Sequence, residues 1–261
     1  MNAAKAVRAL VLIPTYNERE NLPTVVTAIR ATVPGADILV LDDNSPDGTG
    51  ALADDLAGKD AHLHVMHRTE KNGLGDAYLA GFAWGLERGY DVLIEMDADG
   101  SHPASALPAM IDAVSAPNTY GLAIGSRWVA GGSVVNWPKS RLWISKAGNA
   151  YSEFMLHLGV KDATGGFRAF RADVLRNLHL ENVQSHGYCF QIDMTIRVED
   201  AGYTITEIPI EFRERAHGVS KMSKGIVFEA MWKVTQWGIG HIFNPRRKRV
   251  KAAMAERAAL G

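Results

Sequence analysis

Two carboxylates separated by one residue, Asp97 and Asp99, follow an apolar run at 92–96 and precede a glycine. A short run of this kind is typical of a buried strand, so both acids are expected where that strand ends. Acids at this spacing suit a hard divalent cation, and such a cation can in turn hold a phosphate. Asp and Gly also favour turns for conformational reasons alone. The pair by itself therefore leaves a metal site and a simple turn both open.

Polar side chains also follow the first two apolar runs of the chain. Tyr16 and Glu18 come after the first run, and Asp43 comes after the second. Ligands of parallel sheets bind at the carboxyl ends of the strands, and an acid there can bond a ribose hydroxyl or a base edge. Asp43 has an alternative role as the N-cap of the next helix, which Ser45 or Asp47 could fill instead. These residues extend the candidate site over three strand ends.

Standard phosphate-binding loops are missing. The chain has no G-x-x-x-x-G-K-[ST] motif, and the segment 73–75 lacks the third glycine of a dinucleotide fingerprint. A bound diphosphate would therefore need cations to offset the strand-end acids. Arg127, Arg215 and Lys221 are candidates, and the segment 213–222 reads as a basic loop that closes over phosphates. The same segment also reads as a solvated charged turn.

Apolar runs alternate with amphipathic segments over the first half of the chain. Strands are predicted at 8–13, 38–41, 62–67, 91–96 and 121–125, and helices at 22–33, 73–88, 103–114 and 139–158, with one more ending at 56. This alternation predicts an α/β fold, with a mostly parallel Rossmann-like sheet flanked by helices. The period-two segment 204–212 contains Pro209 and is predicted to be an edge strand. We expect a catalytic domain over 1–224 and an amphipathic helix with a basic tail over 225–261.

Composition narrows the class of protein. The 261 residues are 47% hydrophobic and 22% charged with a formal net charge of −1, so we expect a soluble globular protein and no nucleic-acid partner. The single cysteine, Cys189, excludes an internal disulfide and is predicted to be buried. No signal peptide or membrane span is evident. His62, His64 and His67 share one strand, where ordinary surface positions are preferred over a zinc site.

The C-terminal segment carries an apolar stripe. Between 226 and 243 the apolar residues recur at helical spacing, and Arg246, Arg247, Lys248, Arg249 and Lys251 follow. An amphipathic helix with a basic end suits the surface of an anionic membrane or a membrane partner. A core-packing helix with a solvated tail explains the same pattern.

Several motifs taken in order resemble one family. They are Val11-Leu12-Ile13-Pro14-Thr15-Tyr16-Asn17-Glu18, Asp42-Asp43-Asn44-Ser45-Pro46-Asp47-Gly48-Thr49, Met96-Asp97-Ala98-Asp99, Gly125-Ser126-Arg127, Gly165-Gly166-Phe167-Arg168 and the segment 215–221. Together they resemble the inverting family-2 glycosyltransferases, and among these the polyprenol-phosphate (dolichol-phosphate) mannose synthases. The resemblance implies a GT-A fold, GDP-mannose as the donor, and a polyprenyl monophosphate lipid as the acceptor.

The resemblance also implies roles for individual residues. The guanosine would be contacted by Pro14, Tyr16, Glu18, Leu41 and Asp43. The sugar nucleotide and its Mg²⁺ or Mn²⁺ would be met by Asp97, Ala98 and Asp99, of which Asp97 and Asp99 are the metal ligands. Phosphate groups would be bound by Arg127, Arg215 and Lys221, and the acceptor phosphate by Arg141, Ser145 and Arg168. Some relatives have a metal-binding Gln where this chain has Ser101, so water is expected to replace that ligand.

The implied mechanism is a single in-line displacement. An acceptor phosphate is already anionic at neutral pH, so no obligatory catalytic base is assigned; Asp97, Asp99 and Arg127 are the predicted catalytic residues. The protein is expected to act at the cytoplasmic face of a membrane, and a separate membrane-anchoring subunit is among its candidate partners. Two alternatives stay open: a polyprenyl-phosphate glucosyltransferase that uses UDP-glucose, and a membrane-associated nucleotide-binding subunit without turnover.

Overall fold

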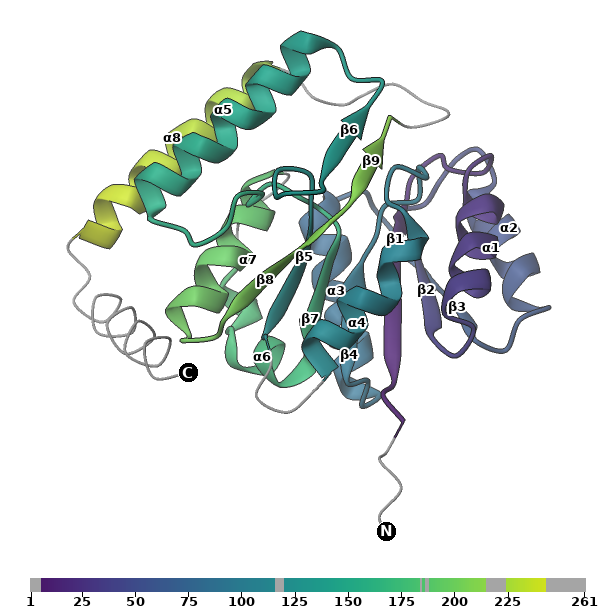
Figure 1. The fold of residues 1–261 in the computed structure, drawn as a ribbon. Helices are drawn as coiled ribbons and strands as arrows, with labels where there is room; N and C mark the ends of the chain where they lie inside the picture. The colour runs from purple at the N-terminus through teal and green to yellow at the C-terminus, as the bar shows by residue number, and fades with distance from the viewer. Residues whose placement is uncertain (1–5, 116–119, 184, 186–187, 215–223, 243–261) are drawn as a thin grey trace.

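A seven-stranded sheet forms the centre of the molecule, in the order β3-β2-β1-β4-β7-β5-β8 (Figure 1). The computed structural model describes residues 6–115, 120–183, 185, 188–214 and 224–242. The strands are β1 (Ala9–Thr15), β2 (Asp37–Asp42), β3 (Leu63–His67), β4 (Val92–Glu95), β5 (Leu122–Ser126), β6 (Ser133–Val135), β7 (Arg168–Arg171), β8 (Ile205–Pro209) and β9 (Glu211–Arg213). The helices are α1 (Leu22–Thr32), α2 (Thr49–Ala57), α3 (Leu74–Glu87), α4 (Leu107–Ser115), α5 (Lys139–Leu156), α6 (Ala172–Asn177), α7 (Tyr188–Asp200) and α8 (Lys224–Ile242), with 3₁₀ turns at Ala104–Ala106 and Leu180–Asn182.

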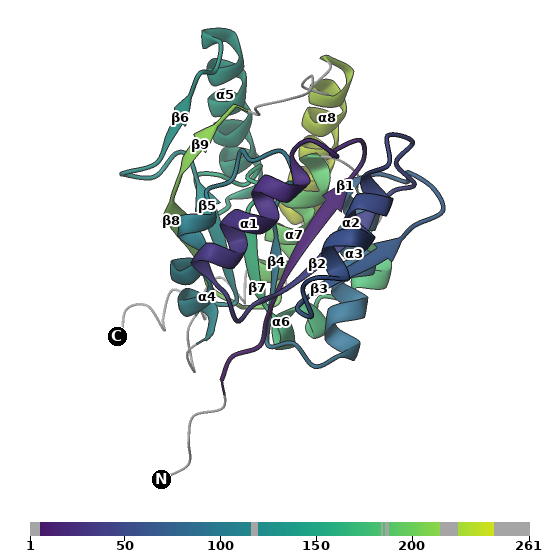
Figure 2. The same ribbon diagram turned by 90° about the vertical axis from the view of Figure 1, so that its right-hand side faces the viewer.

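Helices cover both faces of this sheet (Figure 2). Along β1, Leu10 and Leu12 pack into one hydrophobic cluster with α3, α6 and α7, whereas Val11 and Ile13 pack into another with α1 and α4. All four side chains have no exposed surface. Successive residues of a strand point to opposite faces, so a continuous apolar run is what a strand covered on both sides requires. The predicted α/β fold class is therefore confirmed.

One strand departs from the predicted parallel order. β7 lies between β4 and β5 and is antiparallel to both. No strand was predicted there, because four residues with two arginines carry no clear strand pattern. The predicted strand 204–212 divides at Ile210 into β8, which lies at the edge of the sheet as Pro209 predicted, and β9, which pairs with β6.

α8 packs against the rest of the fold along one side. Its Val234 is buried in the same cluster as Leu156 of α5, and Thr235 exchanges a hydrogen bond of 2.7 Å with Tyr151 of α5. This packing confirms the alternative of a core-packing helix for the face of α8 that carries Val234 and Thr235. None of the described helices combines the length and hydrophobicity needed to cross a membrane. The basic residues after 243 lie outside the described residues, and the proposed domain division at 224/225 stays a prediction.

The loops after β1, β2 and β4 each turn sharply at one residue. Asn17, Asn44 and Gly100 have φ angles of 60°, 56° and 75°. Asn and Gly adopt this left-handed conformation more readily than other residues. Because β1 is paired in parallel with both β2 and β4, these three loops emerge at the same edge of the sheet.

Candidate active site

The Asp97–Asp99 segment folds into a closed loop at the end of β4. The backbone N–H of Asp97 donates to His102 Nδ1 (3.1 Å), and the N–H of Ser101 donates to Asp99 Oδ1 (3.0 Å). The Tyr78 hydroxyl donates to Asp97 Oδ1 at 3.4 Å. Burial and the nearby Asp97 carboxylate raise the pKa of Tyr78 well above its ordinary value, so this hydroxyl stays protonated and remains a donor. These hydrogen bonds therefore hold the carboxylates of Asp97 and Asp99 in position.

The His102 side chain supports this loop through its ring contacts and hydrogen bond. Its ring stacks on Phe167 at 5.1 Å and contacts Phe212 edge-on at 5.5 Å, and its side chain is almost fully buried. Because Nδ1 accepts a hydrogen bond, the neutral ring carries its proton on Nε2, which lies 3.8 Å from Asp97 Oδ2. The sequence analysis did not single out His102. A histidine three residues beyond the second acid was the available signal.

A divalent cation fits the residues present in this loop. Mg²⁺ is typically bound by one or two carboxylates together with water and substrate phosphates. Next to Asp99, the buried Ser101 Oγ has no hydrogen-bond partner among the described residues, so an oxygen that requires a partner lies beside the pair. No cluster of three or more acidic, histidine or cysteine ligands occurs in the described part of the chain. A cation held here would thus depend on water or substrate for its remaining ligands.

The predicted nucleoside residues lie on the loops after β1 and β2. Asp43 is buried, and its Oδ1 accepts a hydrogen bond from Arg68 Nη1 at 2.8 Å. Burial raises the pKa of Asp43, and the Arg68 charge opposes that shift. The N-cap alternative for Asp43 is wrong, since Asp47 Oδ1 accepts from the Thr49 N–H at the start of α2.

We call the predicted nucleoside residues, which are Pro14, Tyr16, Glu18, Leu41 and Asp43, the nucleoside corner. The Lys71 ammonium lies 3.7 Å from the centre of the Tyr16 ring. Glu18 Oε2 accepts from Asn21 Nδ2 at 2.8 Å, and the Glu18 N–H donates to Thr49 Oγ1. Pro14 is half-buried, and Leu41 is buried at the end of β2. The sequence analysis missed Arg68 and Lys71 because basic residues after an edge strand are usually solvated.

Arg127 is held more tightly than the sequence suggested. Its Nε and Nη2 donate to the two carboxylate oxygens of Asp162 at 2.7 and 2.6 Å, and Nη2 also donates to Thr164 Oγ1. The Arg127 side chain is 9% exposed and Asp162 is fully buried. The Asp162 carboxylate offsets much of the Arg127 charge, which the sequence analysis predicted to bind a phosphate group. The phosphate role of Arg127 stays a prediction.

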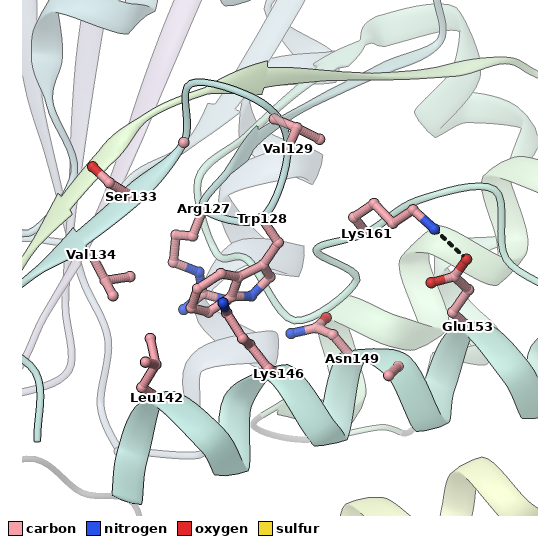
Figure 3. Close-up of a pocket in the computed structure, with 12 residues that line it drawn as sticks. Arg127, Trp128, Val129, Ser133, Val134, Leu142, Lys146, Asn149, Glu153 and Lys161 are labelled. Atoms are coloured by element: carbon pink, nitrogen blue, oxygen red, sulfur yellow. Dashed lines mark hydrogen bonds and ion pairs between the residues drawn. The ribbon is translucent and has the colours of Figure 1, made fainter. Parts of the chain in front are cut away.

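A cavity of about 440 Å³ lies between α5 and the loop that follows Arg127. Figure 3 shows Arg127 and Trp128 on one side of this cavity, and Lys146 and Asn149 of α5 on the other. Farther along, Lys161 forms an ion pair with Glu153 at 2.6 Å. Both polar and apolar side chains line this cavity, which lies beside the candidate site.

The predicted acceptor-phosphate residues separate into two groups. Arg141 and the half-buried Ser145 lie one turn apart on α5, and Arg141 Nη1 donates to Glu214 at 2.8 Å. Arg168 has no exposed surface and donates to the carbonyls of Ala163, Gly165 and Gln191 and to Thr195 Oγ1. Burial lowers the pKa of Arg168 to about 10. The assignment of Arg168 to the acceptor phosphate is wrong, because its donors are directed to buried partners.

Two of the predicted phosphate ligands cannot be placed. Arg215 and Lys221 lie outside the described residues. The predicted nucleoside residues and the Asp97–Asp99 loop lie at the ends of the neighbouring strands β2, β1 and β4, and Arg127 lines the cavity. Cys189 is buried in α7 as predicted. His62 pairs with Asp37, and His67, the last residue of β3, pairs with Asp54 of α2.

A mostly parallel sheet flanked by helices on both faces is the GT-A fold of glycosyltransferases, and solved structures share this fold. Glucosyl-3-phosphoglycerate synthase from Mycobacterium tuberculosis, in complex with Mn²⁺ and UDP, superposes with a TM-score of 0.62 at 18% identity, over 87% of this chain and 77% of that one. A mannosyltransferase from Pyrobaculum calidifontis, in complex with GDP-mannose and Mn²⁺, gives 0.53 at 19% identity, over 97% and 76%.

The chain belongs to glycosyl transferase family 2, whose family model matches residues 10–178. It is 58% identical to the polyprenol monophosphomannose synthase of Mycolicibacterium smegmatis, over 89% of this chain and 87% of that protein. It is 54% identical to the undecaprenyl-phosphate mannosyltransferase of Micrococcus luteus, over 94% of this chain and 99% of that protein. The family predicted from the motifs is confirmed.

Proposed function

We propose that this protein transfers mannose from GDP-mannose to a polyprenyl monophosphate and forms a β-mannosyl phosphoryl polyprenol with inversion. The observation that carries the proposal is the 58% identity, over 89% of the chain, to a polyprenol monophosphomannose synthase. The geometry supports it through two acids at a central strand end, with a nucleoside corner on one side and a cavity on the other. We further propose that the protein works peripherally at the cytoplasmic face of a membrane, with or without an anchoring subunit.

The residues act by binding and orientation. An oxygen of the acceptor phosphate attacks the anomeric carbon of mannose while the bond from that carbon to the GDP oxygen breaks. Asp43, oriented by Arg68, would hold the nucleoside, and Asp97 and Asp99 would hold a divalent cation. That cation, when bound, supplies positive charge to the departing diphosphate. Because the attacking oxygen is already anionic, the protein needs to position the two substrates more than to move a proton.

The test is transfer of radiolabelled sugar, from labelled GDP-mannose or labelled UDP-glucose, into the lipid fraction with purified protein and polyprenyl phosphate. We expect label from GDP-mannose, no label from UDP-glucose, and loss of transfer with EDTA that added Mg²⁺ or Mn²⁺ restores. Asp99→Asn should lower the rate by about 100-fold or more. Asp55→Asn, at an exposed position of α2, is the matched control and should leave it unchanged. Transfer only from UDP-glucose, or nucleotide binding without transfer to any prenyl phosphate, would refute the proposal.

A further inference from the structure

Asn149 is the first buried residue of α5. The buried residues of this helix are Asn149, Ser152 and Leu156, so no side chain from 139 to 148 is buried. Most helices in proteins are held in place by an apolar face packed on a core. The first half of α5 lacks such a buried face, and its position depends largely on polar contacts.

The Asn149 amide uses all of its polar groups within the protein. Its Nδ2 donates to the Ser145 carbonyl, one turn earlier in α5, at 3.0 Å and to Thr164 Oγ1 at 2.9 Å. Its Oδ1 accepts from the Thr164 N–H at 3.2 Å. A side-chain amide has two N–H donors and one carbonyl oxygen, so each polar group of Asn149 has a partner. Two of these three hydrogen bonds connect α5 to Thr164.

The loop that carries Thr164 is itself fixed to the central sheet. Glu207 of β8 accepts hydrogen bonds from the backbone N–H groups of Lys161 and Asp162, at 2.8 and 3.0 Å. Arg168 of β7 donates to two carbonyls of the same loop, at 2.7 Å each. Thr164 is therefore a fixed point of the sheet, and Asn149 attaches the first half of α5 to that point.

Thr164 also contacts Arg127 across the cavity. Its Oγ1 accepts from Arg127 Nη2 at 3.1 Å as well as from Asn149, so one hydroxyl oxygen receives a hydrogen bond from each wall of the cavity in Figure 3. Arg141 and Ser145 lie two turns and one turn before Asn149. Residues spaced by four share one side of a helix. The attachment at Asn149 thus also fixes how far this side of α5 lies from Arg127.

We propose that Asn149, acting through Thr164, is a positioning residue that sets the separation between Arg127 and the side of α5 with Arg141 and Ser145. The inference rests on the proposed function, in which Arg127 is a predicted phosphate ligand and the two α5 residues are predicted ligands of the acceptor phosphate. Small displacements of binding groups weaken productive binding strongly. Asn149 itself is not a ligand in this proposal, because its amide is already fully hydrogen-bonded.

Hydrogen exchange of the full-length protein without substrates tests the attachment of α5. In Asn149→Ala, the amides of residues 142–148 should exchange at least about tenfold faster, and those of β1 and β4 should stay within about twofold of wild type. Asn177→Ala is the matched control, because it also removes an asparagine hydrogen bond, to the Tyr203 hydroxyl at 2.7 Å, but on α6. It should leave exchange at 142–148 unchanged. Unchanged exchange in Asn149→Ala would overturn the proposal.

Steady-state transfer to a short, water-soluble prenyl phosphate tests the positioning role. Asn149→Ala and Thr164→Val should each raise the KM for this acceptor at least about tenfold and leave the KM for GDP-mannose within about twofold. Thr164→Ser keeps the hydroxyl and should stay within about threefold of wild type. The double variant, Asn149→Ala with Thr164→Val, should fall well short of the product of the two effects, because both changes disrupt one contact. Fully multiplied effects, or equal increases in both KM values, would overturn the proposal.

These measurements separate the positioning role from the proposed function. Transfer by wild type with an unchanged acceptor KM in Asn149→Ala would refute the positioning role and uphold the function. If wild type transfers mannose to no prenyl phosphate, the proposed function fails, and calorimetric binding of the same prenyl phosphate decides the positioning role. At least about tenfold weaker binding by Asn149→Ala would then uphold that role, and equal or absent binding in both proteins would overturn it.

Discussion

Asp162 orients Arg127 through three hydrogen bonds, one from the backbone N–H and two from the guanidinium. We predict that Asp162→Asn destabilises the fold by about 3 kcal/mol, because it leaves a largely buried arginine without its counter-charge. Urea denaturation measures this change. Glu211→Gln removes an ion pair with Arg213 that is largely exposed, so the free energy of unfolding is expected to change by less than about 1 kcal/mol. Equal midpoints for the two variants would contradict a structural role for the Asp162 pair.

Glu95 gives the stability of the protein a specific pH dependence. Its carboxyl is fully buried, Oε1 has no hydrogen-bond partner among the described residues, and burial raises its pKa from 4.5 to about 8. Between these two values the unfolded chain has lost the proton and the folded chain keeps it. Stability contributed by the protonated carboxyl is therefore full below about pH 4.5 and decreases as pH rises toward 8.

We predict that Glu95→Gln removes this decrease. Between pH 5.5 and 8, the wild-type free energy of unfolding should fall relative to that of the variant by about 1 kcal/mol per pH unit. The measurement is urea denaturation across this range in EDTA, which keeps a cation at the adjacent acids from contributing. Glu87→Gln, at an exposed position, serves as the control and should give a curve parallel to wild type. A parallel curve for Glu95→Gln as well would show that Glu95 is ionised in the folded protein.

The positions of residues at strand ends could be predicted from the sequence, and the buried partners of a side chain could not. Asp43, Asp97 and Asp99 follow apolar runs, so pattern alone places them at one edge of a parallel sheet. Arg168 sits in a glycine-rich motif that resembles a ligand site, yet its guanidinium donates to the nearby carbonyls of Ala163 and Gly165 and also to Gln191 and Thr195 of α7, which are distant in sequence. Such partners are set by tertiary packing, which a local pattern does not contain.

At the level of the elements, α3 approaches the sheet more closely than a side chain permits. A Cβ on Gly85 would lie 2.6 Å from Leu93 Cδ2 and 2.9 Å from Leu10 Cδ2. We predict that Gly85→Ala destabilises the protein by about 1–3 kcal/mol, since overpacking outweighs the gain in helix propensity. Gly148→Ala on α5 meets nothing within 4 Å and should stabilise it by up to about 1 kcal/mol. Thermal unfolding of both variants tests the pair, and a shift in the same direction for both would contradict close packing at α3.

The order of strands could be predicted only in part. Six strands of the sheet are mutually parallel, and five of them, β1 to β5, alternate with helices in sequence, which predicts a common parallel sheet. β7 enters the sheet antiparallel, from a four-residue segment with an arginine at each end. β7 is held in the sheet by its pairing with β4 and β5 and by the burial of Phe170. The periodicity of its own sequence therefore did not predict a strand.

Under the proposed function, the molecule as a whole has a donor side and an acceptor side on either side of the end of β4. The nucleoside corner lies on loops after β1 and β2, and the cavity lies under α5 beyond β5. β4, which carries the acids, lies between these groups of strands in the sheet. The donor side is therefore built from the first half of the chain, and the acceptor side depends on the second half. Occupation of one side should stabilise the whole fold, because both share a single sheet.

We predict that GDP with Mn²⁺ raises the unfolding temperature more than GDP alone, since the diphosphate and the acids each need the cation to offset their charge. A ligand at 100 times its dissociation constant adds about 2.7 kcal/mol of stability, which thermal scanning detects readily. UDP with Mn²⁺ should give a smaller shift if the corner formed by Tyr16, Glu18 and Asp43 selects guanine. Asp99→Asn should lose most of the Mn²⁺-dependent part while keeping its own unfolding temperature. An equal shift in that variant would place the cation away from Asp97 and Asp99, and an equal shift with UDP would remove base selection from the corner.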